Sequence, residues 1–302
     1  MKMNAEMRNL LSDRVPFEAI VDRPAFKLPD GKKMLVWIIV NVEHWTMRNP
    51  MPRMVLSPPM GQALQPDLPN WAWHEYGMRS GFWRIHEALT SRGIIPTMAT
   101  NGIVCESYPR VAEAGLKHGW EMMGHGYIQG PMHKLENQQE EINRACEAIK
   151  KFSGKSPVGW ESPGLTENDH TIDCLSAAGI EYVADWVLDD QPVWIKADPK
   201  PVLSVPYTVE LNDIPMMLLQ SHSGSEMLDR GVLQLNRLRE ESNKITRVMA
   251  ISVHPYITGA AHRISYFEAL LDMVLEKEGV MICTGEEINN LYRAQFPAPQ
   301  KK

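Results

Sequence analysis

The chain has 302 residues, of which 44% are hydrophobic and 23% are charged, and its formal net charge at pH 7 is -6. This composition is typical of a soluble globular protein and excludes extensive intrinsic disorder. The acidic balance argues against a nucleic-acid-binding protein, which normally has a basic excess. The length allows one large α/β domain or two ordinary domains.

The cysteines and the N-terminal segment carry information about the compartment. The four cysteines are widely spaced and form no Cys-x-x-Cys pair, so we expect buried free thiols rather than a disulfide framework or a zinc knuckle. The first residues contain no continuous apolar run like that of a signal peptide, and no later segment approaches the roughly 20 apolar residues that cross a bilayer. We therefore expect a cytoplasmic enzyme.

The N-terminal third contains an arm, a buried strand and a long loop. Residues 1–33 are polar and contain proline, and they are interpreted as an N-terminal arm. The apolar run Met34 to Val40 predicts a strand that is buried on both faces. Prolines are frequent between Arg48 and Asn70, which predicts a long loop that could cover a functional site.

Helical and strand patterns alternate along the rest of the chain. We predict helices over 79–92, from 107 onward, around 142–152, from a Thr166/Asp169 capping box to Gly179, and over 264–274. We predict strands over 94–99, 120–123, near 158, and over 180–184, 202–207, 216–219, 248–253 and 280–283. This order favours a single α/β barrel domain over residues 34–295 with a mostly parallel sheet, followed by a tail over 296–302, although a doubly wound open sheet is an alternative.

Polar side chains follow the predicted strands at the point where each strand ends. Because the carboxyl ends of parallel strands meet at one face of an α/β fold, residues that are far apart in the sequence can form one site there. The residues in question are Asn41, Glu43, His125, Glu161, Asp185 and His254.

Asn41 and Glu43 lie two positions apart at the end of the first strand. Side chains of a strand repeat every two residues, so the two could face a common pocket. The carboxylate of Glu43 could bind a metal or act as a base. A solvated strand end is the alternative interpretation and carries about equal weight.

Two histidines are candidates for catalysis. His125 stands between two glycines, which allow close approach of a ligand, and its imidazole could coordinate a metal or exchange a proton. His254 directly follows a predicted buried strand and is a candidate acid or base. Either histidine alone is more often structural, but their shared position at strand ends favours a functional role.

Two loops could shape a substrate pocket. Trp160 and Glu161 begin one loop, where the indole ring could face a substrate. Asp185 and Trp186 begin the other, and the acidic residues that follow them could equally form a solvated turn.

Seven motifs, in this order, resemble the polysaccharide deacetylase (NodB-homology) superfamily, most closely its branch of PuuE-type allantoinases and cyclic-imide hydrolases. The resemblance covers roughly residues 34–292. No single motif is decisive, whereas their common order is hard to obtain by chance. The motifs are Val40-Asn41-Val42-Glu43, the stretches 76–84 and 96–102, Gly124-His125-Gly126, the stretch 159–164, the stretch 206–213 with Tyr207, and Val253-His254-Pro255.

The resemblance implies a distorted (β/α)7-type barrel that hydrolyses an amide-type bond. It also implies a divalent metal such as zinc, held by an acid and two histidines beside an Asp base, and a late histidine that protonates the leaving nitrogen. By this correspondence Glu43 and His125 are metal ligands, Asn41 stands at the base position and His254 is the acid. Asn41 cannot act as a carboxylate base and Gln129 replaces the second metal histidine, so a metal-independent site is a serious alternative.

Three functions follow from these features. The first is an allantoinase-like or imidase-like hydrolase of a small cyclic or linear amide, with His254, Glu43, Asn41 and Glu161 at the catalytic centre. Trp160, His125, Trp186, Asp185 and Tyr207 are then expected to bind the substrate. The second is an N-deacetylase of a sugar or of peptidoglycan, and the third is a non-catalytic binding protein. We expect a small-molecule substrate, no nucleic-acid or membrane partner, and a homo-oligomer.

Overall fold

The structure is a computed structural model, and it describes residues 11–299. Residues 1–10 of the predicted arm and 300–302 of the predicted tail lie outside this range. Within it, no helix is both long and apolar enough to span a bilayer.

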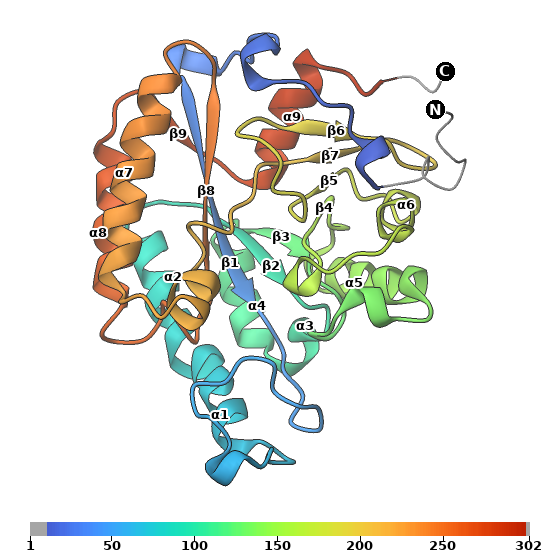
Figure 1. The fold of residues 1–302 in the computed structure, drawn as a ribbon, viewed down its shortest axis with the longest axis vertical. Helices are drawn as coiled ribbons and strands as arrows, with labels where there is room; N and C mark the ends of the chain where they lie inside the picture. Colours follow the sequence, from blue (N-terminus) through green and yellow to red (C-terminus); the bar gives the residue numbers. More distant parts are fainter. Residues whose placement is uncertain (1–10, 300–302) are drawn as a thin grey trace, which may run out of the picture.

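A nine-stranded sheet forms the centre of the molecule (Figure 1). Its order is β6-β7-β5-β4-β3-β2-β1-β8, and β9 pairs with the start of β1. All pairings are parallel except that of β6 with β7. The strands are β1 Met34–Val42, β2 Thr97–Thr100, β3 Glu121–Gly124, β4 Gly159–Trp160, β5 Tyr182–Val183, β6 Val193–Ile195, β7 Val202–Ser204, β8 Arg247–Val253 and β9 Val280–Ile282.

Helices cover the outside of this sheet. In Figure 1, α7 and α8 lie together along one side, while α5 and α6 lie on the opposite side. The helices are α1 Leu68–Tyr76, α2 Phe82–Thr90, α3 Val104–Ser107, α4 Pro109–Lys117, α5 Gln138–Ser153, α6 Thr171–Ala177, α7 Ser225–Glu241, α8 Ile264–Glu276 and α9 Gly285–Gln295.

The sheet forms a half-barrel, and a few backbone hydrogen bonds connect β8, at one end of the sheet, with the segments that flank β6 and β7 at the other end. The backbone N–H of Val248 on β8 donates to Asp190 O at 2.8 Å, and Asn212 forms a parallel bridge with Ser252. From β1 to β5 the strands follow one another in sequence order. In a doubly wound sheet the strand order would reverse within this run, at a switch point. The predicted distorted barrel is therefore confirmed, and the open-sheet alternative is wrong.

The side chains of β1 alternate between two cores, which decides where the site lies. Its even-numbered residues, from Met34 to Val42, pack beneath the outer helices. Leu35, Trp37 and Ile39 pack inside the barrel. Because side chains of a strand repeat every two residues, the odd-numbered positions that follow Ile39 also face the barrel interior.

Two predicted elements differ from the structure. The apolar run 216–219 belongs to a π-helical turn, Ile214–Leu219, rather than to a strand. A short apolar run does not distinguish a strand from a buried helical turn. The predicted capping box is also wrong, because the Thr166 hydroxyl donates to Pro163 O at 2.8 Å and α6 begins only at Thr171.

The described part of the N-terminal arm packs against the barrel. Phe26 is 2% exposed and belongs to the interior core. Arg23 forms an ion pair with Asp189 at 3.0 Å and donates to the Tyr292 hydroxyl at 2.7 Å. Residues 11–33 therefore contribute to the core of the domain.

Candidate active site

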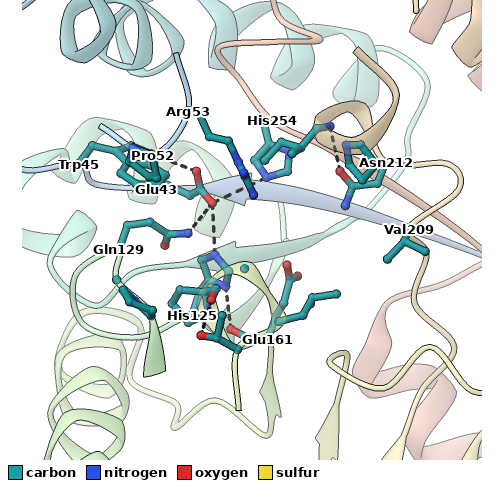
Figure 2. A pocket seen from close by; sticks show the side chains of 18 of the residues that line it. Glu43, Trp45, Pro52, Arg53, His125, Gln129, Glu161, Val209, Asn212 and His254 are labelled. Atoms are coloured by element: carbon teal, nitrogen blue, oxygen red, sulfur yellow. Dashed lines mark hydrogen bonds and ion pairs between the residues drawn. The ribbon is translucent and has the colours of Figure 1, made fainter. Parts of the chain in front are cut away.

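The polar residues gather where the interior faces of the strands reach the carboxyl end of the barrel. Each lies two positions beyond a residue that faces the interior, as Glu43 lies beyond Asn41 and His125 beyond Met123. Together they line a cavity of about 390 Å³ (Figure 2). The predicted site residues on its wall are Glu43, His125, Glu161, Tyr207 and His254.

Glu43 is the residue on which the polar contacts converge. Its Oε1 accepts a hydrogen bond from Gln129 Nε2 at 2.7 Å and lies 3.4 Å from His125 Nε2 and 3.7 Å from His254 Nε2. Its Oε2 accepts from the Trp45 indole at 3.1 Å. Burial alone would raise the pKa of Glu43, but His254 and His125 lower it below its ordinary value. Glu43 is therefore an ionised anchor for the two imidazoles.

The orientation of the Gln129 amide follows from a chain of hydrogen bonds. The backbone N–H of His44 donates to Asn101 Oδ1 at 2.8 Å, which assigns Nδ2 of Asn101 as the donor on its other side. That nitrogen donates to His125 O and, at 2.9 Å, to Gln129 Oε1. The Gln129 NH₂ group must then face Glu43. Gln129 thus acts as a hydrogen-bond donor to the carboxylate.

His125 is almost completely buried and is held at both ring nitrogens. Its Nδ1 donates to Glu161 O at 2.7 Å, and its Nε2 faces Glu43. Burial alone would lower the pKa of His125, but the bond with Glu43 and the charge of Glu161 raise it to about 9. The imidazole is therefore a cation at neutral pH.

Glu161 has the properties of a general base. Its Oε1 accepts from the Tyr207 hydroxyl at 3.0 Å, whereas its buried Oε2 has no partner among residues 11–299. Burial raises the pKa of Glu161 to about 7, although the charge of His125 acts in the opposite direction. A base with a pKa near the working pH is the most effective in catalysis.

His254 forms a buried pair with Asp213, which the sequence motifs contained but which we did not predict as a site residue. Asp213 Oδ1 accepts from His254 Nδ1 at 2.6 Å, and Asp213 Oδ2 accepts from the His254 backbone N–H at 2.7 Å and from Thr258 Oγ1 at 2.6 Å. Burial alone would lower the pKa of His254, but Asp213 and Glu43 raise it. The only signal for Asp213 was its position at the end of the motif 206–213.

Asn41 lies beneath the cavity rather than on its wall. It is fully buried, and its Nδ2 donates to Ser252 Oγ at 2.8 Å. Ser252 Oγ also lies 2.7 Å from the Tyr207 hydroxyl, which links Asn41 to Glu161 through two hydroxyl groups. Asn41, which was expected to act in catalysis, thus contacts the site through Ser252 and is not part of the cavity wall.

Trp160, Asp185 and Trp186, which were expected to bind the substrate, do not line this cavity. Trp160 is fully buried and packs beneath the outer helices, because it precedes Glu161 by one position and so faces the other side of the strand. Asp185 accepts from the Ser162 backbone N–H at 2.6 Å. Asp185 therefore holds the loop that begins at Glu161.

The donor set does not fit the metal that the family resemblance implies. Gln129 turns its NH₂ group toward Glu43, and an amide NH₂ donates hydrogen bonds and does not bind a cation. Its amide oxygen is engaged by Asn101. Residues 11–299 contain no group of three His, Cys, Asp or Glu side chains placed to hold a metal ion. We therefore assign roles at this site to protein side chains alone.

Comparisons with known proteins agree with the fold and the motifs. The family model for polysaccharide deacetylase matches residues 73–183. A Schizosaccharomyces pombe protein named "Putative polysaccharide deacetylase" is 28% identical over 245 residues, which cover 74% of this chain and 76% of the relative.

Two solved structures share the architecture over nearly the whole chain. The structure of a "probable Polysaccharide deacetylase from Pseudomonas aeruginosa PAO1" has a TM-score of 0.82 and 22% identity, covering 92% of this chain and 97% of that one. The structure of PuuE allantoinase has a TM-score of 0.80 and 20% identity, covering 92% and 96%. The match over residues 73–183, the Schizosaccharomyces pombe relative and the shared architecture together identify a polysaccharide deacetylase domain in this chain.

Proposed function

We propose that the protein hydrolyses a carbon-nitrogen bond of a small cyclic or linear amide, as allantoinases and cyclic-imide hydrolases do. The observation that carries this proposal is the pairing of two groups on one cavity wall: Glu161, whose pKa is raised to about 7, and His254, which is bound to Asp213 at 2.6 Å. Two titratable groups tuned by different surroundings are typical of an acid and a base.

The proposed reaction uses Glu161 as the base and His254 as the acid. Glu161 Oε2 takes a proton from a water molecule whose oxygen attacks the carbonyl carbon. The protonated His254 then gives its Nε2 proton to the nitrogen as the carbon-nitrogen bond breaks. The charged His125 stabilises the negative charge that develops on the carbonyl oxygen. Glu43 has a lowered pKa and its charge raises the pKa of both imidazoles, so it is a less suitable base than Glu161.

The size and lining of the cavity favour a small substrate. Its volume of about 390 Å³ accommodates one ring with a short substituent, and its walls include the apolar side chains of Trp45, Pro52 and Leu165. The names of the relatives favour an N-deacetylase of a sugar as the second candidate. A non-catalytic binding protein is the third, because an amide stands at position 41 where the family has its base.

A substrate panel distinguishes these candidates. We expect measurable hydrolysis of hydantoins, allantoin or cyclic imides, and loss of this activity in His254→Ala and Glu161→Gln. Hydrolysis of N-acetylglucosamine oligomers alone would overturn the proposal in favour of the sugar deacetylase. Binding of these compounds without turnover would favour the non-catalytic protein. Because Gln129 offers no free ligand atom to a metal and the proposed acid and base are side chains, the activity should persist after dialysis against a chelator.

A further inference from the structure

One side chain of the cavity wall, Arg53, takes no part in the reaction described above. It comes from the long loop that connects β1 with α1, and it reaches into the cavity next to Pro52 (Figure 2). Its side chain is half-buried. A guanidinium group carries five N–H donors, and partial burial makes unpaired donors costly.

Arg53 has no hydrogen bond, ion pair or aromatic contact with any residue in the range 11–299. This distinguishes it from the other arginines of that range that are not exposed, each of which has such a partner. Those partnered arginines are Arg14, Arg23, Arg84, Arg92, Arg230, Arg239, Arg247, Arg263 and Arg293. The protein thus leaves one half-buried guanidinium unpaired, and it does so on the wall of the active-site cavity.

The loop around Arg53 is held in place by side chains of α1 and its cap. Asn70 Oδ1 accepts from the backbone N–H groups of Val55 and Leu56 at 2.8 and 3.0 Å, and Asn70 Nδ2 donates to Leu56 O at 2.9 Å. Asn70 is itself fixed by Asp67, which accepts from it at 2.8 Å. Arg53 is therefore presented from an anchored segment of the loop.

From these observations we infer that Arg53 binds a carboxylate of the substrate, so that the preferred substrates are small amides carrying a carboxylate group. The planar fork of a guanidinium matches the two oxygens of a carboxylate. The two carboxylates of the cavity wall, Glu43 and Glu161, both lack an ion pair with Arg53, which leaves the guanidinium free for the ligand. The inference rests on the proposed function, since it narrows the substrate class of the same site.

Two ring compounds that differ in a single group test this inference. Hydantoin-5-acetic acid carries a carboxylate, and hydantoin-5-acetamide replaces it with a neutral group of the same shape. We expect kcat/KM of the native protein to be higher for the acid. Arg53→Met should lower kcat/KM for the acid by about 10- to 100-fold, mainly through KM, because a charged hydrogen-bonded pair is lost. The amide should change by less than about threefold.

Arg48→Met is the matched control, because Arg48 is an exposed arginine of the same loop whose side chain also has no partner among residues 11–299. It should leave both compounds unchanged. Either of two results would overturn the inference. An equal effect of Arg53→Met on acid and amide would indicate that Arg53 contacts the ring that the two compounds share. No preference of the native protein for the acid would show that the carboxylate is not recognised.

A binding measurement separates failure of the inference from failure of the proposed function. Calorimetry on Glu161→Gln, with and without Arg53→Met, reports the affinity for the two compounds without turnover. A 10- to 100-fold weaker binding of the acid alone, as a charged pair predicts, would support the inference even if the native protein hydrolysed neither compound. Absence of turnover would contradict only the proposed function, whereas acid binding that is independent of Arg53 would contradict only the inference.

Discussion

At the residue scale, Glu161 links activity to pH and to stability. A base must be deprotonated to act, so we expect kcat/KM to fall as the pH drops below about 7, which is where burial places the pKa of this carboxyl. Glu161→Gln should remove this limb together with at least about 99% of the activity. A pH-rate profile of both proteins is the measurement, and an unchanged acidic limb in a still active variant would contradict the assignment.

The same pKa shift predicts a stability effect of opposite sign. The pKa of Glu161 is raised from 4.5 to about 7, so between these values the folded protein binds more protons than the unfolded chain. The free energy of unfolding then falls as the pH rises through this range. Glu161→Gln should therefore be more stable than the native protein at pH 8 and no more stable at pH 4. Urea denaturation at the two pH values checks this, with Glu136→Gln as the control.

Asp213 is a positioning residue, since it acts through His254. Asp213→Asn removes the charge that raises the pKa of His254. The His254 imidazole of the variant should therefore lose its proton at a lower pH than that of the native protein. We expect kcat to fall by about 100-fold and the basic limb of the pH-rate profile to move downward. Asp213→Glu should restore part of kcat and part of the position of the basic limb. The control, Asp169→Asn, should change neither. A fall in kcat with an unmoved basic limb would indicate a purely structural role.

At the element scale, the π-helical turn Gly77–Gly81 determines how the His254 loop docks. A Cβ on Gly81 would lie 1.9 Å from Pro255 O, and one on Gly77 would lie 2.6 Å from the Tyr256 backbone nitrogen. The two glycines therefore allow the turn to pack against the residues that directly follow His254.

Gly81→Ala tests this packing. The added methyl group must displace Pro255, so we expect a loss of about 2 kcal/mol in the free energy of unfolding and a fall in kcat at the same time. Ser80→Ala, on the same turn, should change neither quantity appreciably. Thermal unfolding and steady-state kinetics are the measurements. A variant with native stability and native kcat would show that the loop has room to move.

At the scale of the whole molecule, the segment 11–33 helps to close the half-barrel. Arg23 is 5% exposed at its side chain and pairs with Asp189, which is 12% exposed, next to the residues that join the two ends of the sheet. Arg23→Ala leaves this carboxylate without its partner, so we expect a loss of about 3 kcal/mol in the free energy of unfolding by urea. Lys32→Ala, an exposed control, should change it by less than about 0.5 kcal/mol. Equal effects of the two substitutions would show that the segment contributes little.

The alternating direction of strand side chains explains which predicted site residues line the cavity and which do not. Glu43, His125, Glu161, Tyr207 and His254 line the cavity as expected. Trp160 could have been excluded beforehand, because it neighbours Glu161 on one strand and the two must face opposite sides. The π-helical turn at 214–219 could not have been recognised, because a short apolar run has no distinctive period.

The sequence alone placed Glu43, His125, Glu161 and His254 at the ends of predicted strands, because buried parallel strands have a clear apolar pattern and their carboxyl ends converge. Only the tertiary structure decided which partner each polar group takes. Asp213 and His254 are 41 positions apart and Gln129 and Glu43 are 86 apart, and no local pattern relates such positions. Those partners set the orientation of each side chain and the pKa values of the buried groups, and therefore the chemistry that we propose for the site.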